Sequence, residues 1–182
     1  EKQIVRDTAM PARLQIVDPA EPTYQQPTDD ASWQDFDIGE KWGRKYGWIW
    51  LRGEFEVPGD WEGGRIEAHC DHQTYPESKG RFERQANWPA GAEGQLYSNG
   101  ARLGAVDHQH KAMAVPHAKA GRSLSVFGTF FTGRVEVEQR LRLYQLRWVD
   151  TATEKLFYDL TVAYQVTQQT DDSEPARHQL TR

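Results

Sequence analysis

Short segments in which apolar and polar residues alternate, separated by turn residues, dominate the middle of the chain. The clearest is 48–57, WIWLRGEFEV, which reads as an extended strand with two different faces. One face is apolar and is formed by Ile49, Leu51, Phe55 and Val57. The other face carries Trp48, Trp50, Arg52, Glu54 and Glu56. Pro58-Gly59-Asp60 follows with residues that favour a turn, so the strand ends there.

Further segments of this kind recur at intervals of about ten residues. The expected strands are 13–17, 65–70, 111–116, 123–131 and 134–146. Residues 94–104 predict a β-hairpin, because Asn99-Gly100 suits the positive φ angles of a type I′ turn. The polar residues 71–92 read as a long loop. Several short strands joined by turns predict an all-β protein, an antiparallel β-sandwich between about Trp33 and Leu146.

The hydrophobic period changes after the last strand. Thr151 and Glu154 fit a capping box, and a helix is expected over 151–168. Its core-facing stripe would consist of Leu156, Phe157, Leu160, Ala163 and Tyr164. Ser173 and Pro175 suit the start of a second helix, which has buried nothing by residue 182. We therefore expect an irregular entry segment at 1–32, a sandwich at 33–148, and a helical linker at 149–182 that leads to an absent domain.

Composition excludes several classes of function. Of the 182 residues, 37% are hydrophobic and 12% aromatic, which favours a packed domain over a disordered segment. The net charge of -5 argues against a nucleic-acid or anionic-membrane partner. No apolar run is long enough to span a membrane. A single cysteine, Cys70, forms no internal disulfide framework and favours a reducing compartment, so we expect a cytoplasmic location.

Catalytic motifs are missing from the sequence: it has no phosphate-binding glycine loop, no nucleophile elbow and no paired-cysteine motif. The nearest set of metal ligands combines 70–72, Cys-Asp-His, with His108 and His110, which matches no closed zinc pattern. We therefore expect neither a metal nor a cofactor, and interpret the histidines as solvated loop residues. Four tryptophans are candidates for stacking on sugar rings, with core packing as the alternative for each: Trp48, Trp50, Trp61 and Trp88.

Two stretches resemble the N-terminal β-sandwich of glycoside hydrolase family 38 α-mannosidases. The first is 39–69, whose matching residues are Trp42-Gly43, Trp50-Leu51-Arg52, Pro58 and Trp61-Glu62-Gly63. The second, 91–110, matches at Gly91, Glu93, Gly94, Tyr97, Asn99, Gly100, Gly104, Asp107 and His110. In addition, 156–166 is similar to the family's helical linker. The resemblance spans about residues 33–170, although the loop at 71–90 is longer than the family pattern.

The resemblance implies a jelly-roll, galactose-binding-like sandwich that is not catalytic by itself. Its expected partners are the catalytic domain of the same polypeptide, mannose-containing carbohydrate and further copies of the full-length enzyme. A divalent metal such as zinc is implied for the absent catalytic domain. The candidate carbohydrate or interdomain contacts are Trp48, Trp50, Glu93, Asp107 and His110. Asp107 and His110 would either orient their own loop or reach a neighbouring domain.

Three other functions are compatible with the sequence. Sugar-binding domains of family 2 glycosidases share much of the first pattern, but Glu93 and 157–160, FYDL, favour family 38. An autonomous carbohydrate-binding module would need an exposed aromatic platform, for which Trp48 and Trp50 are the candidates. A small metal-dependent hydrolase using His108 and His110 is the third alternative.

Overall fold

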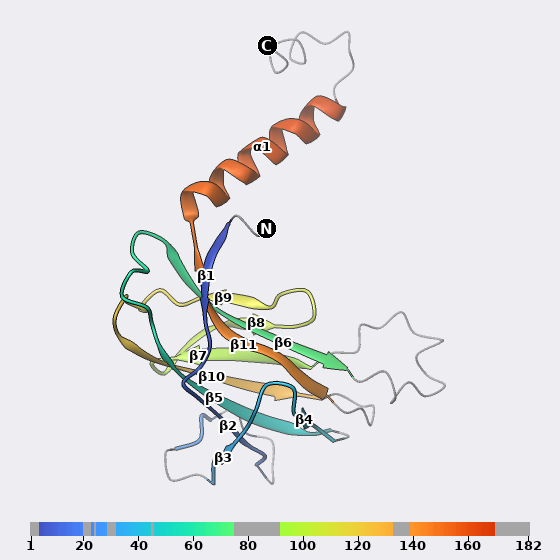
Figure 1. Ribbon diagram of the computed structural model, residues 1–182. Helices are drawn as coiled ribbons and strands as arrows, with labels where there is room; N and C mark the ends of the chain where they lie inside the picture. The colour runs from blue at the N-terminus through green and yellow to red at the C-terminus, as the bar shows by residue number, and fades with distance from the viewer. Residues whose placement is uncertain are drawn as a thin grey trace.

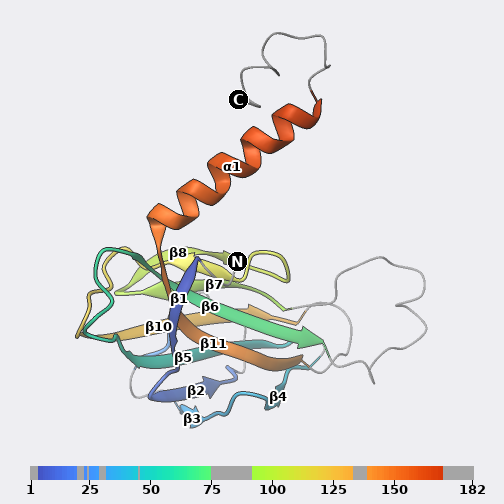
Figure 2. The ribbon, with the colours of Figure 1, turned by 45° about the horizontal axis from the view of Figure 1, so that its top comes forward.

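The computed structural model describes residues 4–19, 23, 25–28, 32–44, 46–74, 92–132 and 139–169. In these ranges the chain forms two antiparallel sheets and one helix. Figure 1 shows the sheets stacked as a sandwich, with the helix projecting from one end, and Figure 2 shows the same arrangement from a second direction. The predicted antiparallel sandwich with a C-terminal helix is therefore confirmed.

One sheet is built around the last strand of the sandwich. Its path runs β1 (Val5–Ala9), β11 (Gln139–Val149), β6 (Arg65–Thr74) and β9 (Ala112–Ala114), and β4 (Lys41–Trp42) also pairs with β11. The other sheet has the order β3 (Gln34–Asp35), β2 (Arg13–Val17), β5 (Trp48–Glu56), β10 (Ser123–Phe131), β7 (Glu93–Ser98) and β8 (Ala101–Val106). The predicted strands at 13–17 and 123–131 have the expected bounds.

The predicted β7–β8 hairpin is confirmed. Asn99 and Gly100 connect the two strands with φ angles of 51° and 72°. A type I′ turn needs positive φ at both central positions, and asparagine and glycine tolerate that conformation best. Local turn chemistry thus sets the pairing next to the turn, and a register shift between Leu96 and Tyr97 changes the pairing further along the two strands.

The core lies between the inner faces of the two sheets. On β5, the alternation holds, because Ile49, Leu51 and Phe55 are buried in the main apolar cluster together with the following Val57. β6 contributes Ile66, Ala68 and Cys70 from the facing sheet, and β11 contributes Leu141, Tyr144 and Leu146. Hydrophobic burial on this scale is the main stabilising contribution to a sandwich.

The N-terminal segment differs from the sequence prediction. Instead of an irregular stretch with one strand, the described part of 1–32 contains two strands that belong to different sheets, since β1 pairs with β11 and β2 with β5. The expected boundary at residue 32 therefore does not separate the entry segment from the sandwich. Three predictions fall wholly or partly outside the described ranges. They are the first five residues of the strand at 134–146, most of the long loop at 71–92, and the second helix at Ser173 and Pro175.

The helix α1 spans Thr151–Gln169, close to the predicted 151–168, but its N-cap is Asp150. Asp150 Oδ1 accepts hydrogen bonds from the backbone N–H groups of Ala152 and Thr153, each at 3.0 Å. The predicted capping box between Thr151 and Glu154 is therefore wrong. The cap is one residue earlier, and the Glu154 carboxylate binds Arg65 instead.

The apolar stripe of α1 does not face the core, contrary to the sequence prediction. Large apolar side chains along the helix are exposed, with fractions from 45% to 66%: Leu156, Phe157, Tyr158, Leu160, Val162, Tyr164 and Val166. Figure 1 shows why, because α1 leaves the end of the sandwich and packs on neither sheet. A helix with this much exposed apolar surface is typical of an element with a further partner.

Candidate functional site

Four of the five predicted contact residues lie at one end of the sandwich. Trp48 begins β5, Glu93 begins β7, and Asp107 and His110 belong to the turn after β8. The register extends this set by one residue, because Phe131 on β10 pairs with both Trp48 and Glu93. Gly94 pairs with Val106, which brings Glu93 beside Asp107. We call Trp48, Phe131, Glu93 and Asp107 the end row.

The aromatic half of the end row is a packed pair of rings. The ring centroids of Trp48 and Phe131 lie 5.4 Å apart, with an angle of 36° between their planes. Both side chains are half-buried on the outer face of the six-stranded sheet. Sequence reasoning missed Phe131, since only the pairing of β5 with β10 places it next to Trp48.

Trp50 cannot form an exposed platform in this conformation, which corrects the sequence prediction. It lies on the outer face as expected, but its exposed fraction is 0%. Its indole Nε1 donates to the carbonyl oxygen of Thr23 at 3.2 Å, and its ring packs on Tyr97 with centroids 5.5 Å apart. Trp50 is thus fully buried, with Thr23 and Tyr97 among its contacts.

The remaining tryptophan candidates are Trp61 and Trp88. Trp61 is 3% exposed, and its Nε1 donates to Asp7 Oδ2, so it fills the core. Trp88 falls outside the described residues. Trp48 is therefore the one tryptophan of the four candidates that is both described and partly accessible.

Asp107 organises its own turn. Its Oδ1 accepts the backbone N–H groups of Gln109 and His110, both at 2.7 Å, and its carboxylate lies 3.2 Å from His110 Nδ1. The His110 backbone hydrogen bond, the His110 side chain and then the Gln109 N–H lower the pKa of Asp107 to about 2. Asp107 is thus an ionised residue that holds its own turn together. The His110 side chain is largely exposed.

The proposed set of metal ligands is divided between two faces of β6. Cys70 and His72 point into the core region, whereas Asp71 pairs on the outer face with Lys111 at 2.8 Å and Arg142 at 3.6 Å. In the part of the chain that is described, no group of three or more His, Cys, Asp or Glu side chains could hold a metal ion. The geometry therefore gives no support to the hydrolase alternative.

His72 is instead part of a buried hydrogen-bonded chain. Trp42 Nε1 lies 3.2 Å from His72 Nδ1, and His72 Nε2 lies 3.1 Å from Cys70 Sγ. An indole nitrogen can only donate, so Nδ1 carries no proton and the neutral ring donates from Nε2 to sulfur. Burial lowers the pKa of His72 to about 3 and raises the pKa of the Cys70 thiol. Neither group is poised as a nucleophile or base near pH 7.

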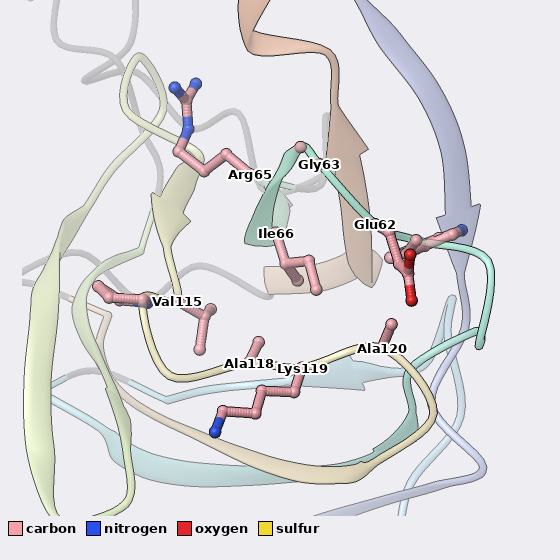
Figure 3. Close-up of a pocket in the computed structure, with 11 residues that line it drawn as sticks. Glu62, Gly63, Arg65, Ile66, Val115, Ala118, Lys119 and Ala120 are labelled. Atoms are coloured by element: carbon pink, nitrogen blue, oxygen red, sulfur yellow. The ribbon is translucent and has the colours of Figure 1, made fainter.

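A hollow lies at the opposite end of the sandwich, beside the base of α1. It has a volume of about 540 Å³ and separates the β5–β6 connection from the β9–β10 connection. Figure 3 shows Ile66, Val115 and Ala118 pointing into it, while the guanidinium of Arg65 points away. Glu62 and Lys119 also line it, and none of the predicted contact residues does.

Comparison with known proteins identifies this architecture. The sequence model of the family described as alpha-mannosidase, jelly roll domain, matches residues 10–132, more than half of the chain. The chain belongs to this family. The resemblance to the N-terminal β-sandwich of α-mannosidases is thereby confirmed, and so is the jelly-roll form of the sandwich. No curated protein matches the sequence.

The solved structures that match this chain are distant in sequence. A putative beta-galactosidase from Bacteroides fragilis is 14% identical, with a TM-score of 0.47, over 79% of this chain and 23% of that one. The beta-glucuronidase from Ruminococcus gnavus is 9% identical, with a TM-score of 0.46, over 79% and 29%. The match thus spans less than a third of the length of either structure.

Proposed function

We propose that this jelly roll domain is a non-catalytic accessory part of an α-mannosidase, which packs against the catalytic part of the same polypeptide and shapes carbohydrate access. The observation that carries the proposal is α1, whose apolar side chains are exposed although its first turn is held firmly on the sandwich. Leu156, Leu160 and Tyr164 recur at i, i+4 and i+8 and therefore share one helix face, with Phe157 at its margin. We call these four residues the helix stripe.

The base of α1 gives the helix stripe a defined direction. Arg65 on β6 binds Glu154, and Arg6 on β1 donates to Asp150 Oδ2 at 2.6 Å. These two ion pairs connect the start of α1 to the sheet that contains β1 and β6. A fixed helix presenting an apolar face suits docking better than a flexible tether does.

The Asp107–His110 turn is the second proposed interdomain contact. It lies at the end of β8, whereas α1 begins at the end of β11, and these are opposite ends of the sandwich (Figure 1). A nine-residue strand such as β5 is about 30 Å long. A partner that contacts both elements therefore has to extend along the strands.

The remaining assignments follow from the same proposal. The divalent metal, such as zinc, that the resemblance implies would belong to the catalytic part, and in the described ranges no group of three or more His, Cys, Asp or Glu could hold a metal ion. No described helix is long and apolar enough to cross a membrane. We propose a cytoplasmic location, which the buried, free Cys70 supports. Association of full-length copies is a further part of the proposal.

The test places charges on the helix stripe of the parent enzyme. Leu160→Glu with Tyr164→Lys should lower its hydrolysis of an aryl α-mannoside and its thermal stability, because the charges would be desolvated on docking. Gln165→Glu, at an exposed polar position outside the helix stripe, is the matched control. Sedimentation of both variants separates interdomain docking from association of copies. Unchanged activity, stability and sedimentation in the stripe variant would contradict the proposal.

A parallel test addresses the Asp107–His110 turn. His110→Ala removes an exposed ring and should weaken the parent enzyme while leaving the melting temperature of the 182-residue chain unchanged. Asp107→Ala removes the turn's backbone hydrogen bonds and therefore serves as the variant that reports scaffold loss. Equal melting losses for both variants would show that the turn serves only its own fold.

A further inference from the structure

The end row forms a continuous line across four neighbouring strands. Trp48, Phe131, Glu93 and Asp107 lie on β5, on β10, on β7 and directly after β8. Adjacent strands are about 4.8 Å apart, so the line is about 14 Å long. That length accommodates two to three linked sugar rings laid across the strands.

The two ends of the row offer different chemistry. At one end, the half-buried rings of Trp48 and Phe131 present apolar surface at a 36° mutual tilt. Aromatic faces of this kind pack against the C–H face of a pyranose ring. The rings are held in place by their mutual packing, so little conformational entropy is lost when a ligand binds.

Carboxylates follow next along the row. Glu93 is exposed, and its carboxylate makes no hydrogen bond or ion pair with any residue in the described ranges. Asp107 stays ionised because its turn lowers its pKa to about 2. Carboxylates accept hydrogen bonds from sugar hydroxyls, and none of the four residues is cationic. The charge of the row therefore favours a neutral glycan and disfavours phosphorylated or uronic sugars.

We propose that the end row is a binding site for a neutral, mannose-containing oligosaccharide. One ring of the ligand stacks on Trp48 and Phe131, and the hydroxyls of the next ring donate to Glu93. His110, tied to Asp107, borders the far end of the ligand. The site itself follows from the geometry of the row, whereas the choice of mannose rests on the proposed function of the domain.

The experiment is an NMR titration of the 182-residue chain with α-linked mannotriose. Binding should be saturable, with a dissociation constant of roughly 1 mM, and should shift amide signals of the end row. Trp48→Leu, which keeps apolar packing but removes the ring plane, and Glu93→Gln, which keeps size, should each weaken binding by about tenfold. Glu62→Gln, at the opposite end of the sandwich, should change nothing.

Comparison ligands sharpen the test. Cellotriose should bind more weakly than mannotriose, and trigalacturonate should not bind, because its carboxylates meet those of the row. The proposal is overturned if mannotriose gives no saturable shifts, if both variants bind like the wild type with unchanged melting temperatures, or if trigalacturonate binds best. Equal binding of cellotriose overturns the preference for mannose. The titration needs no catalytic domain, so a failure here is distinguishable from a failure of helix-stripe docking.

Discussion

Arg65, the first residue of β6, forms a two-point ion pair with Glu154 in the first turn of α1. Arg65 Nη1 lies 2.8 Å from Glu154 Oε2, and Arg65 Nη2 lies 2.7 Å from Oε1. Arg65 also binds Glu67, and Glu67 Oε2 accepts a hydrogen bond from Arg147 Nη2 at 2.7 Å. The Arg65 hydrogen bonds lower the pKa of Glu154, and Glu154 is the main cause of the raised pKa of Arg65. The network joins the helix to the sheet at its base.

Glu154→Gln should loosen α1 more than it destabilises the sandwich. The substitution removes a charge from a partly exposed ion pair, so we expect a loss of about 1 kcal/mol in the free energy of unfolding. Spin labels on α1 and on β10 should show a broader distance distribution. Lys155→Gln is the control, because it removes an exposed ion pair with Asp159 within α1 and keeps the pair between Arg65 and Glu154. Equal distributions for both variants would show that Asp150 alone orients the helix.

The Asp150 cap should make the start of α1 sensitive to acid. The Thr153 backbone N–H, then Arg6 and then the Thr153 hydroxyl lower the pKa of Asp150 from 3.8 to about 2. A lowered carboxyl pKa contributes stability that is present above the unfolded pKa and is lost as the pH falls towards the folded pKa. Helical circular dichroism should therefore decrease between about pH 4 and pH 2.

Asp150→Asn is the matched variant for this prediction. Asparagine caps a helix about as well as aspartate but carries no titrating charge. The variant should retain most of the helical signal at pH 7 and lose part of the decrease between pH 4 and pH 2. An identical acid transition in the variant would assign the effect to other carboxylates, such as Asp107.

The sequence predicts strands and turns where local chemistry decides them. The Asn99-Gly100 hairpin needs only its own φ angles, and the apolar face of β5 needs only a period of two. β1 was missed because its sequence, VRDTA, has no apolar face of its own. Its place is set by pairing with β11, which is more than a hundred residues away.

The site depends on relationships that no local pattern contains. Phe131 joins Trp48 and Glu93 only through the registers of β10 with β5 and with β7. Trp50 is on the predicted face, but it is fully buried, and its contacts with Thr23 and Tyr97 join segments that are far apart in the sequence. Asp150 and Thr151 are both favourable N-cap residues, and the hydrogen bond from the distant Arg6 to Asp150 favours Asp150 as the cap.

Gly64 should tolerate no side chain. A Cβ at this position would lie 2.2 Å from Trp148 Nε1 and 2.6 Å from the carbonyl oxygen of Val149. Gly64→Ala should therefore lower the free energy of unfolding by roughly 2 kcal/mol, as overpacking against backbone does. Gly59→Ala, with nothing within 4 Å of its Cβ, is the control for urea unfolding. Similar midpoints for the two variants would mean that the strand end at Val149 shifts easily.

Buried His72 should make the domain less stable in mild acid. Its pKa is about 3 in the folded chain and about 6.5 when unfolded, so between these values the unfolded chain binds more protons. Stability is then fully present above pH 6.5 and falls as the pH drops below it. From pH 7 to pH 5, this single group should cost about 2 kcal/mol of unfolding free energy.

Urea unfolding at the two pH values measures this loss, and His72→Gln should remove most of it. His108→Gln, in the exposed turn, is the control and should keep the full pH dependence. Because His72→Gln also breaks the contacts with Trp42 and Cys70, the ring itself gives a second measurement. In NMR spectra it should remain the neutral tautomer protonated at Nε2 from pH 8 to pH 5. A ring that titrates near pH 6.5 would show that water reaches His72, and the buried hydrogen-bonded chain would then be wrong.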